Sequence, residues 1–414
     1  MMKNKILLTI ADGLGDRPCE SLGWKTPLEA AKKENLNAIA AAGSSGLMDL
    51  HACGTPVGTD LGHMILFGYG LEDYPGRGPI EAFGEGLLLQ EGDVAFRANF
   101  ATVDSANMVL DRRAGRIRTG TKDLAHLLHG YKIDDIEVLF QEATEHRAVL
   151  VLRGPSLSAA VTDSDPKKEG LPYRKVEPKD TSIEAARTAD LLNRLLPKFG
   201  EILADAPLNK ERTQAGHPPA NFLLTRGAGQ MPKLAKMTEK YGFTGACVAA
   251  ESTVLGAARL AGFNTITESC LTGNLDTDVE RKARLAIDAL KNHDFVCLHF
   301  KATDLMGHDN NPTGKVHAVE HYDTMLGYVR TYLPEIHDAN VIVAMAADHS
   351  TPCERREHSG DPVPIVIAGH NIRKDDVIVY DEMHAARGGL LRMTGRMFHD
   401  FLLDYLEVMP KRGN

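Results

Sequence analysis

Short, mostly apolar runs alternate with helical patterns at both ends of this chain. The runs are rich in β-forming residues and carry no charge, which is typical of strands buried on both faces. They are Ile6–Ile10, Phe295–Phe300, Val341–Ala346 and Val363–Ala368. Helical stretches at 280–292 and 315–333 separate the later runs. Strands that alternate with helices at this spacing predict a parallel, doubly wound α/β sheet.

One helix is expected from Thr26 to Ala42, directly after the first strand. Thr26 is a suitable N-cap, Pro27 occupies the first helical position, and Glu29 completes a capping box. Gly43 is expected to end this helix.

The middle of the chain differs from its ends. From about residue 70 to 229, strand and helix patterns mix irregularly and are punctuated by glycine and proline. We therefore expect two domains: a discontinuous α/β core of residues 1–70 and 230–414, and an inserted α+β cap of residues 71–229. The last strand of the cap is predicted at Phe222–Thr225, with Arg226 at its end.

Composition and charge exclude several classes of protein. Of 414 residues, 43% are hydrophobic, which is enough to build a core, so disorder is excluded as the main state. The net charge is −9, which argues against a nucleic-acid-binding surface. The apolar run Ile6–Ala11 is too short for a signal peptide or a membrane span, and the six cysteines are scattered. We expect a cytoplasmic protein with reduced thiols and no membrane partner.

Metal-ligating residue types follow three of the predicted strands. Asp12 follows the first run, and Lys301, Asp304 and His308 follow the second. The third run is followed by the ligand types Asp348, His349 and His358. Singly, each of these residues also fits a turn, a helix cap or a solvated helix face. Because carboxyl ends of parallel strands meet at one sheet edge, the whole set predicts a metal site there.

The ligand count favours two metal ions over one. Six ligands overfill a tetrahedral site, and carboxylate with imidazole favours Mn²⁺ or Zn²⁺ over Ca²⁺. Paired ions are a common device for phosphoryl transfer. Thr59, in a glycine-rich turn, offers a hydroxyl nucleophile; the alternative is that Thr59 is only a helix cap.

Basic clusters in the middle of the chain indicate an anionic substrate, because arginine forks match phosphate and carboxylate oxygens. The residues are Arg112, Arg113, Arg116, His146, Arg147 and Arg226. The chain has no phosphate-binding loop of the P-loop type and no complete dinucleotide fingerprint, so no nucleotide cofactor is expected.

Over nearly its whole length the chain resembles the archaeal-type, 2,3-bisphosphoglycerate-independent phosphoglycerate mutases of the alkaline phosphatase superfamily. The matching segments are DGLGDRP from Asp12, GRGPIEA from Gly76, FRANFATVD from Phe96, DRRAGRI from Asp111, HRAVLVL from His146, TRGAG from Thr225, LHFKATD from Leu298, DHSTPCE from Asp348 and HSGDPVP from His358.

The resemblance implies an alkaline-phosphatase-like core and a role for each matching residue. One metal would be held by Asp12, Thr59, Asp348 and His349, and the other by Asp304, His308 and His358. Thr59 would be the nucleophile, and Lys301 would join the arginines and His146 in binding the substrate. The family reaction moves phosphate between the 3- and 2-hydroxyls of glycerate through a phosphorylated enzyme hydroxyl. It needs no 2,3-bisphosphoglycerate. We expect Mn²⁺, with Zn²⁺, Mg²⁺ and Co²⁺ as alternatives.

Two departures from the family pattern keep alternatives open. The family segment around the nucleophile reads G-S-D-T-A-H, whereas this chain has G-T-D-L-G-H from Gly58. A family P-N-M-D stretch is replaced by Asn35-Leu36-Asn37-Ala38. The extra methyl of Thr59 raises a second hypothesis, a metal-dependent phosphohydrolase or phosphonate-pathway enzyme. A metal-stabilised binding protein without catalysis is the third.

Overall fold

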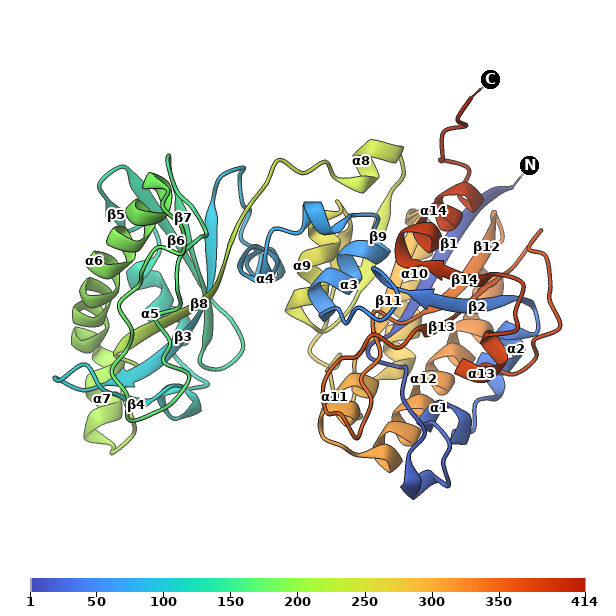
Figure 1. The fold of residues 1–414 in the computed structure, drawn as a ribbon, viewed down its shortest axis with the longest axis horizontal. Coiled ribbons are helices and arrows are strands. Elements are labelled where there is room, and N and C mark those ends of the chain that lie inside the picture. Colours follow the sequence, from blue (N-terminus) through green and yellow to red (C-terminus); the bar gives the residue numbers. More distant parts are fainter. Residues whose placement is uncertain (1, 414) are drawn as a thin grey trace. The chain divides into compact units, whose positions relative to one another are not determined.

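The computed structural model describes residues 2–413, which form two compact units (Figure 1). The core unit comprises the chain up to Tyr74 together with the chain from Ala235 onward. The inserted unit runs from Pro75 to Leu234. The fold is an α/β core interrupted by an α+β insertion, as the sequence predicts.

Within residues 2–413, the core unit contains an eight-stranded sheet with the order β10-β9-β11-β1-β12-β13-β2-β14. Its strands are β1 Lys3–Ala11, β2 Gly43–Asp49, β9 Gly245–Val248, β10 Asn264–Ile266, β11 Phe295–Phe300, β12 Ala339–Ala346, β13 Val363–Ala368 and β14 Leu391–Thr394. All four predicted strands are confirmed, and two of them are longer than predicted.

The expectation of a parallel sheet holds except at β13, which runs antiparallel to both of its neighbours, β12 and β2. The physical reason is the connection that precedes it. Residues 347–362 contain no helix, and a parallel neighbour requires a crossover, usually through a helix. The chain instead turns back at the edge of the sheet, and this turn carries Asp348, His349 and His358.

Two groups of helices cover the sheet (Figure 1). In one group α1, α2 and α10 pack against α12; in the other α9 and α14 pack against α3. Since β1 is buried continuously from Lys5 to Ala11, both of its faces are covered, as in a doubly wound fold. The helices of this unit are α1 Pro27–Ala30, α2 Glu34–Ala40, α3 Thr59–Leu66, α8 Met237–Tyr241, α9 Ser252–Leu260, α10 Val279–Asn292, α11 Ala302–His308, α12 Pro312–Tyr332, α13 Glu382–Ala385 and α14 Gly395–Tyr405.

The single helix expected over residues 26–42 is wrong, because the chain forms α1 and α2 with a break between them. The capping box at Thr26 and Glu29 is present as predicted. Ala31, however, is extended, with ψ at 147°. Asp323 on α12 then accepts hydrogen bonds from the backbone N–H groups at the start of α2, each 2.8 Å long. This tertiary contact provides a new helix start that the local pattern does not show.

The inserted unit, which lies wholly within the described residues, contains a six-stranded antiparallel sheet with the order β4-β3-β7-β6-β5 and β8 paired to β3. Helices α5 and α6 contribute to the larger apolar core, and α4 packs against β3, β7 and β8. The strands are β3 Val94–Val103, β4 Val109–Asp111, β5 Lys132–Ile133, β6 Ile136–Glu142, β7 Arg147–Arg153 and β8 Phe222–Gln230. The helices are α4 Arg77–Gly84, α5 Thr121–Leu128, α6 Ile183–Asp205 and α7 Pro207–Gln214.

The predicted end of the last strand at Thr225 is wrong, because β8 continues to Gln230. Arg226 therefore lies inside a strand. The register against β3 shifts between Ala95 and Arg97, opposite this position, and Gly227 has a φ of 61°. A β-bulge accommodates the glycine-rich stretch without ending the strand.

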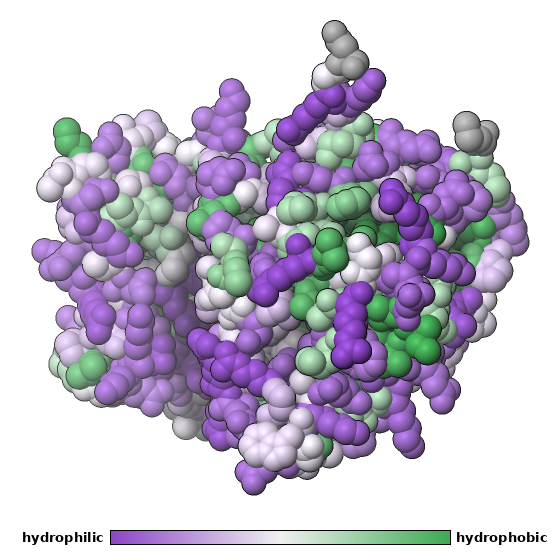
Figure 2. Space-filling model, turned by 45° about the vertical axis from the view of Figure 1, so that its right-hand side comes forward, coloured by the Kyte–Doolittle hydropathy of each residue, from purple (hydrophilic) through white to green (hydrophobic). Residues whose placement is uncertain are grey.

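The surface carries scattered hydrophobic residues among predominantly hydrophilic ones, as the face in Figure 2 shows. None of the helices in residues 2–413 combines the length and apolar character needed to cross a bilayer. All six cysteines, which lie in the described part of the chain, are free thiols.

Candidate functional site

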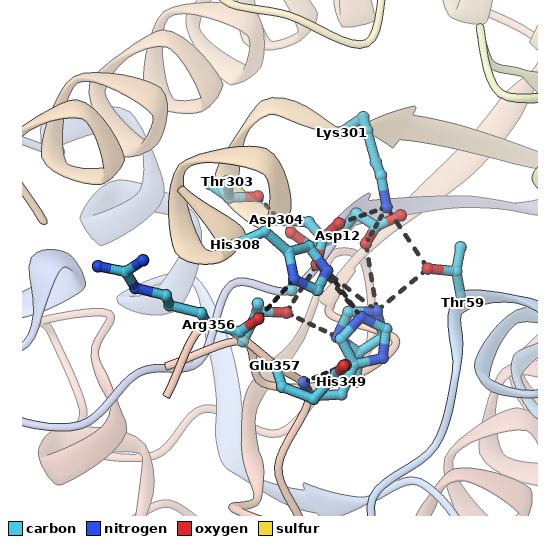
Figure 3. Close-up of polar contacts among 12 residues, drawn as sticks. Asp12, Thr59, Lys301, Thr303, Asp304, His308, His349, Arg356 and Glu357 are labelled. Atoms are coloured by element: carbon cyan, nitrogen blue, oxygen red, sulfur yellow. Dashed lines mark hydrogen bonds and ion pairs between the residues drawn. The ribbon is translucent and has the colours of Figure 1, made fainter. Parts of the chain in front are cut away.

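The predicted ligands meet at one edge of the core sheet, because β11, β1 and β12 are neighbours and run parallel. Asp12 follows the last residue of β1, and Lys301 follows the last residue of β11. Asp348 and His349 follow β12, after Ala347. Thr59 is the first residue of α3 and faces the same point (Figure 3).

One group of side chains surrounds Nε2 of His349. This nitrogen lies 3.3 Å from a carboxylate oxygen of Asp12 and 3.3 Å from one of Asp348. The hydroxyl oxygen of Thr59 is 3.2 Å from the same nitrogen. The other three residues that the resemblance assigns to this metal are thus each within contact distance of His349.

A second group forms around Oδ1 of Asp304. Nε2 of His308 is 3.4 Å from this oxygen, and Nε2 of His358 is 3.5 Å from it. The two ring nitrogens are 3.2 Å apart. His308 comes from α11, whereas His358 comes from the turn between β12 and β13, so the group joins two elements far apart in sequence.

The chemistry of these donors fits divalent metal ions. Nδ1 of His308 lies 3.0 Å from the carbonyl oxygen of Arg356, and Nδ1 of His358 lies 2.9 Å from that of Val57. Because a carbonyl only accepts, both Nδ1 atoms carry a proton, and in the neutral rings both Nε2 atoms present lone pairs. Two lone pairs facing each other beside a carboxylate are unfavourable unless a cation lies between them. Outer hydrogen bonds that fix the tautomer in this way are typical of metal-binding histidines.

Lys301 belongs to this site and not to the inserted unit. Its ammonium lies 3.0 Å from Asp12, 2.6 Å from Asp304 and 3.4 Å from the hydroxyl of Thr59. Burial alone would lower the pKa of Lys301, but the two carboxylates outweigh burial and raise it. Burial raises the pKa of Asp12, yet the Lys301 ammonium and two histidines hold it well below its ordinary value. The carboxylates therefore stay ionised, as metal ligands must be.

Thr59 does not serve as the helix cap that the sequence left open. Gly58 occupies the N-cap, and the Thr59 hydroxyl is directed to His349 and Lys301 instead. A hydroxyl at a helix N-terminus, next to an ammonium, lies where a developing negative charge is stabilised.

The basic residues predicted for substrate binding gather in the inserted unit around a cavity of about 260 Å³. It is lined by Asn99, Arg112, Arg113, Arg116, Glu145, His146, Arg147 and Arg226. Arg112 differs in its surroundings, since Asp165 holds its guanidinium through contacts of 2.6 and 2.9 Å.

The surroundings of this cavity are rich in positive charge. Burial and the nearby Arg147 and Arg113 lower the pKa of His146 to about 4, so its imidazole is neutral near pH 7. Nε of Arg226 and Nδ1 of His146 are buried without a hydrogen-bond partner. Buried polar atoms without partners are costly, and oxygen atoms of a bound anion would satisfy them.

Sequence reasoning missed three buried residues that contact the ligand groups: His63, His299 and Thr351. The Thr351 hydroxyl donates to Asp304 over 2.7 Å and lies 3.0 Å from Nδ1 of His349. A histidine inside the apolar run of β11 was the available signal for His299. For the other two residues, the signal was their place in segments that resemble the family: His63 ends G-T-D-L-G-H from Gly58, and Thr351 lies in DHSTPCE from Asp348.

Comparison with known proteins gives consistent results. The family model described as 2,3-bisphosphoglycerate-independent phosphoglycerate mutase matches residues 40–209. A protein of that name from Methanopyrus kandleri is 44% identical over 100% of this chain and 99% of its own length. A Methanocaldococcus jannaschii protein, named as mutase 1 of this kind, is 43% identical over the full length of both chains.

Solved structures extend the similarity to the fold. A Pyrococcus horikoshii protein has a TM-score of 0.84 and 35% identity, with full coverage of both chains. A cofactor-independent phosphoglycerate mutase from Thermoplasma acidophilum has a TM-score of 0.73 and 35% identity, covering 98% of this chain and 100% of its own.

Proposed function

Because the chain belongs to the family of 2,3-bisphosphoglycerate-independent phosphoglycerate mutases, we propose that it interconverts 3-phosphoglycerate and 2-phosphoglycerate. The observation that carries the proposal is the Thr59 hydroxyl, held 3.2 Å from His349 and 3.4 Å from Lys301 beside two groups of metal-type ligands. The proposed compartment is the cytoplasm, which suits a chain with six free thiols.

The residues present fit two divalent ions. Asp12, Thr59, Asp348 and His349 would hold one ion, and Asp304, His308 and His358 the other. We propose Mn²⁺, with Zn²⁺, Mg²⁺ and Co²⁺ as alternatives, since the donors are carboxylate and imidazole without thiolate. Bound ions of this kind supply positive charge that acidifies a neighbouring hydroxyl and neutralises phosphoryl oxygens.

The reaction then proceeds through Thr59. Its oxygen attacks the phosphorus of 3-phosphoglycerate, and the bond from phosphorus to the 3-oxygen breaks. The proton lost by Thr59 is balanced by the one that the 3-oxygen of glycerate gains. The 2-hydroxyl of the same glycerate attacks the phosphorylated Thr59, gives up its proton and restores the free threonine. Lys301 stabilises negative charge on the threonine oxygen.

Retention of glycerate between the two transfers separates a mutase from a phosphatase. We propose that Arg113, Arg147 and Arg226 bind the carboxylate and phosphate oxygens of the substrate, with Arg112, Arg116 and the neutral His146 in the same cavity. The proposal needs this cavity and the core site to act on one substrate molecule. Water that reached phosphorylated Thr59 first would instead release inorganic phosphate.

The test is ³¹P NMR of 3-phosphoglycerate incubated with metal-stripped protein, before and after Mn²⁺ is added. We expect 2-phosphoglycerate to form only with metal, with little inorganic phosphate. Thr59→Ala should abolish the reaction, whereas Thr59→Ser should keep or raise its rate because the extra methyl is removed. Phosphate release without 2-phosphoglycerate, or substantial turnover by Thr59→Ala, would contradict the proposal.

A further inference from the structure

Two buried imidazoles outside the ligand groups contact the ligand carboxylates from inside the core unit. His299 lies on β11 and His63 on α3, and neither side chain is exposed. Their rings are 5.0 Å apart and nearly perpendicular, at 67°. We call these two residues the backing histidines.

His299 holds one oxygen of Asp12. Its Nε2 lies 2.9 Å from Oδ2, and because the carboxylate is ionised, Nε2 must be the donor. The other oxygen of Asp12, Oδ1, is the one that lies near His349 and Lys301. Lys282, also fully buried, donates to the backbone carbonyl of His299 over 2.9 Å. The backbone of His299 is thus held by Lys282, and its imidazole contacts Asp12.

His63 joins Thr59 to Asp348. Its Nδ1 donates to the backbone carbonyl of Thr59 over 2.8 Å, one helical turn earlier, and lies 3.3 Å from Oδ2 of Asp348. This oxygen is buried and has no hydrogen bond of its own. The same nitrogen therefore contacts both the start of α3 and a ligand carboxylate, and its hydrogen bond goes to Thr59.

Packing alone does not explain these two rings. Nε2 of His63 and Nδ1 of His299 are buried without a hydrogen-bond partner. Such atoms lose their hydration on folding and gain nothing in return. An apolar side chain would fill the same space without that loss, so the retained imidazoles are explained by what their other nitrogens do.

We propose that His299 and His63 are positioning residues for metal binding, each through one specified nitrogen. His299 orients Asp12 through Nε2, and His63 holds Thr59 at the start of α3, beside Asp348, through Nδ1. The inference rests on the proposed metal-binding role of these carboxylates. Outer hydrogen bonds to metal ligands typically change metal affinity by about 10- to 100-fold, and this is the effect expected here.

Amide side chains make the nitrogen specificity testable. The amide nitrogen of glutamine can take the place of histidine Nε2, and that of asparagine the place of Nδ1. His299→Gln and His63→Asn should therefore keep nearly full Mn²⁺ affinity in titration calorimetry of metal-stripped protein. His299→Asn and His63→Gln should weaken it by about 10- to 100-fold. Thermal unfolding of the metal-free variants checks that each one folds.

His399→Asn is the matched control. His399 on α14 is also buried, donates through Nδ1 to a backbone carbonyl (that of Leu66, 2.9 Å away) and has an unpartnered Nε2. It belongs to neither ligand group, so its substitution should leave Mn²⁺ affinity unchanged.

A second measurement needs no variant. In ¹⁵N-histidine NMR of the metal-free protein, His299 should show the Nε2–H tautomer and a proton should reside on Nδ1 of His63. The inference would be overturned by the opposite proton positions, or by equal Mn²⁺ affinities of the glutamine and asparagine variants at both sites. Either result would leave the proposed function intact. Failure of the unsubstituted protein to bind Mn²⁺ would overturn the proposed function together with it.

Discussion

Replacing Lys315 by methionine should destabilise the core unit by about 3–5 kcal/mol, because it leaves a buried carboxylate without its counter-charge. Neither Lys315 nor the side chain of Asp16 is exposed beyond 1%. The Lys315 ammonium donates to Asp16 over 2.9 Å and to the carbonyl oxygens of Gly15 and Thr351 over 3.2 and 2.9 Å. Methionine fills a similar volume but offers no donor.

The magnitude follows from burial. An exposed ion pair contributes about 0–1 kcal/mol, since water screens it. A buried pair that loses one partner costs several times more, and two carbonyls lose a donor as well. This is a large part of a typical total stability of about 5–15 kcal/mol. Lys291→Met is the control: its ion pair with Asp288 is short, at 2.7 Å, but about half exposed.

Urea unfolding of metal-free protein, followed by far-ultraviolet circular dichroism, measures the effect. Adding Asp16→Asn to Lys315→Met should recover part of the loss, because it removes the uncompensated charge. If Lys315→Met stays within about 1 kcal/mol of the unsubstituted protein, as expected for the exposed pair, the burial argument is refuted.

Three further predictions concern metal, substrate and pH. Asp304→Ala and His358→Ala should each lose bound metal and activity together; two equivalents of metal by elemental analysis would refute the ligand assignment. Arg226→Ala should lower kcat/KM by a factor that corresponds to about 2–5 kcal/mol of lost transition-state stabilisation, because a charged contact to the substrate anion disappears. Unchanged kinetics would exclude that role. Burial raises the pKa of Glu382 to about 7, so the folded state binds its proton more tightly than the unfolded state. That contribution to stability is present below about pH 4.3 and lost as pH rises through 7. Between pH 5 and 8, the free energy of unfolding of the unsubstituted protein should therefore decrease. In Glu382→Gln this decrease should be smaller by roughly 1–3 kcal/mol. An equal pH dependence of the free energy of unfolding in both proteins would contradict this.

Four strand positions could be predicted because those strands are buried and mostly apolar, whereas the buried β2, with the sequence GSSGLMD, shows no such run. The runs at Phe295–Phe300 and Val363–Ala368 match β11 and β13 residue for residue. The direction of a strand could not be predicted from its apolar run, since direction depends on how the preceding connection crosses the sheet. The break between α1 and α2 could not be predicted from the local sequence either, because it depends on Asp323, which lies almost 300 residues away in sequence.

The ligand groups could be predicted from parallel strands, which bring residues at their carboxyl ends to one edge. Their roles as ligands stay a prediction. The backing histidines could not be found in this way, since they act across the interior from β11 and α3. In the sequence His299 is a single polar residue within an apolar run, a pattern that also fits an ordinary buried side chain, and His63 lies on a helix that also carries Thr59 and Asp60.

The antiparallel return into β13 has a consequence for the site. Because no helix intervenes, the turn from β12 to β13 carries Asp348 and His349 of one group and His358 of the other. Thr351, on the same turn, contacts Asp304 and His349, one residue from each group. Lys315 holds this turn in place, because its ammonium donates both to the Thr351 carbonyl and to the carbonyl of Gly15 in the segment after β1. A displacement of this turn would therefore disturb both ligand groups together, so the Lys315→Met variant should lose Mn²⁺ affinity at both groups and not at one of them. Loss at a single group would show that the two are held independently.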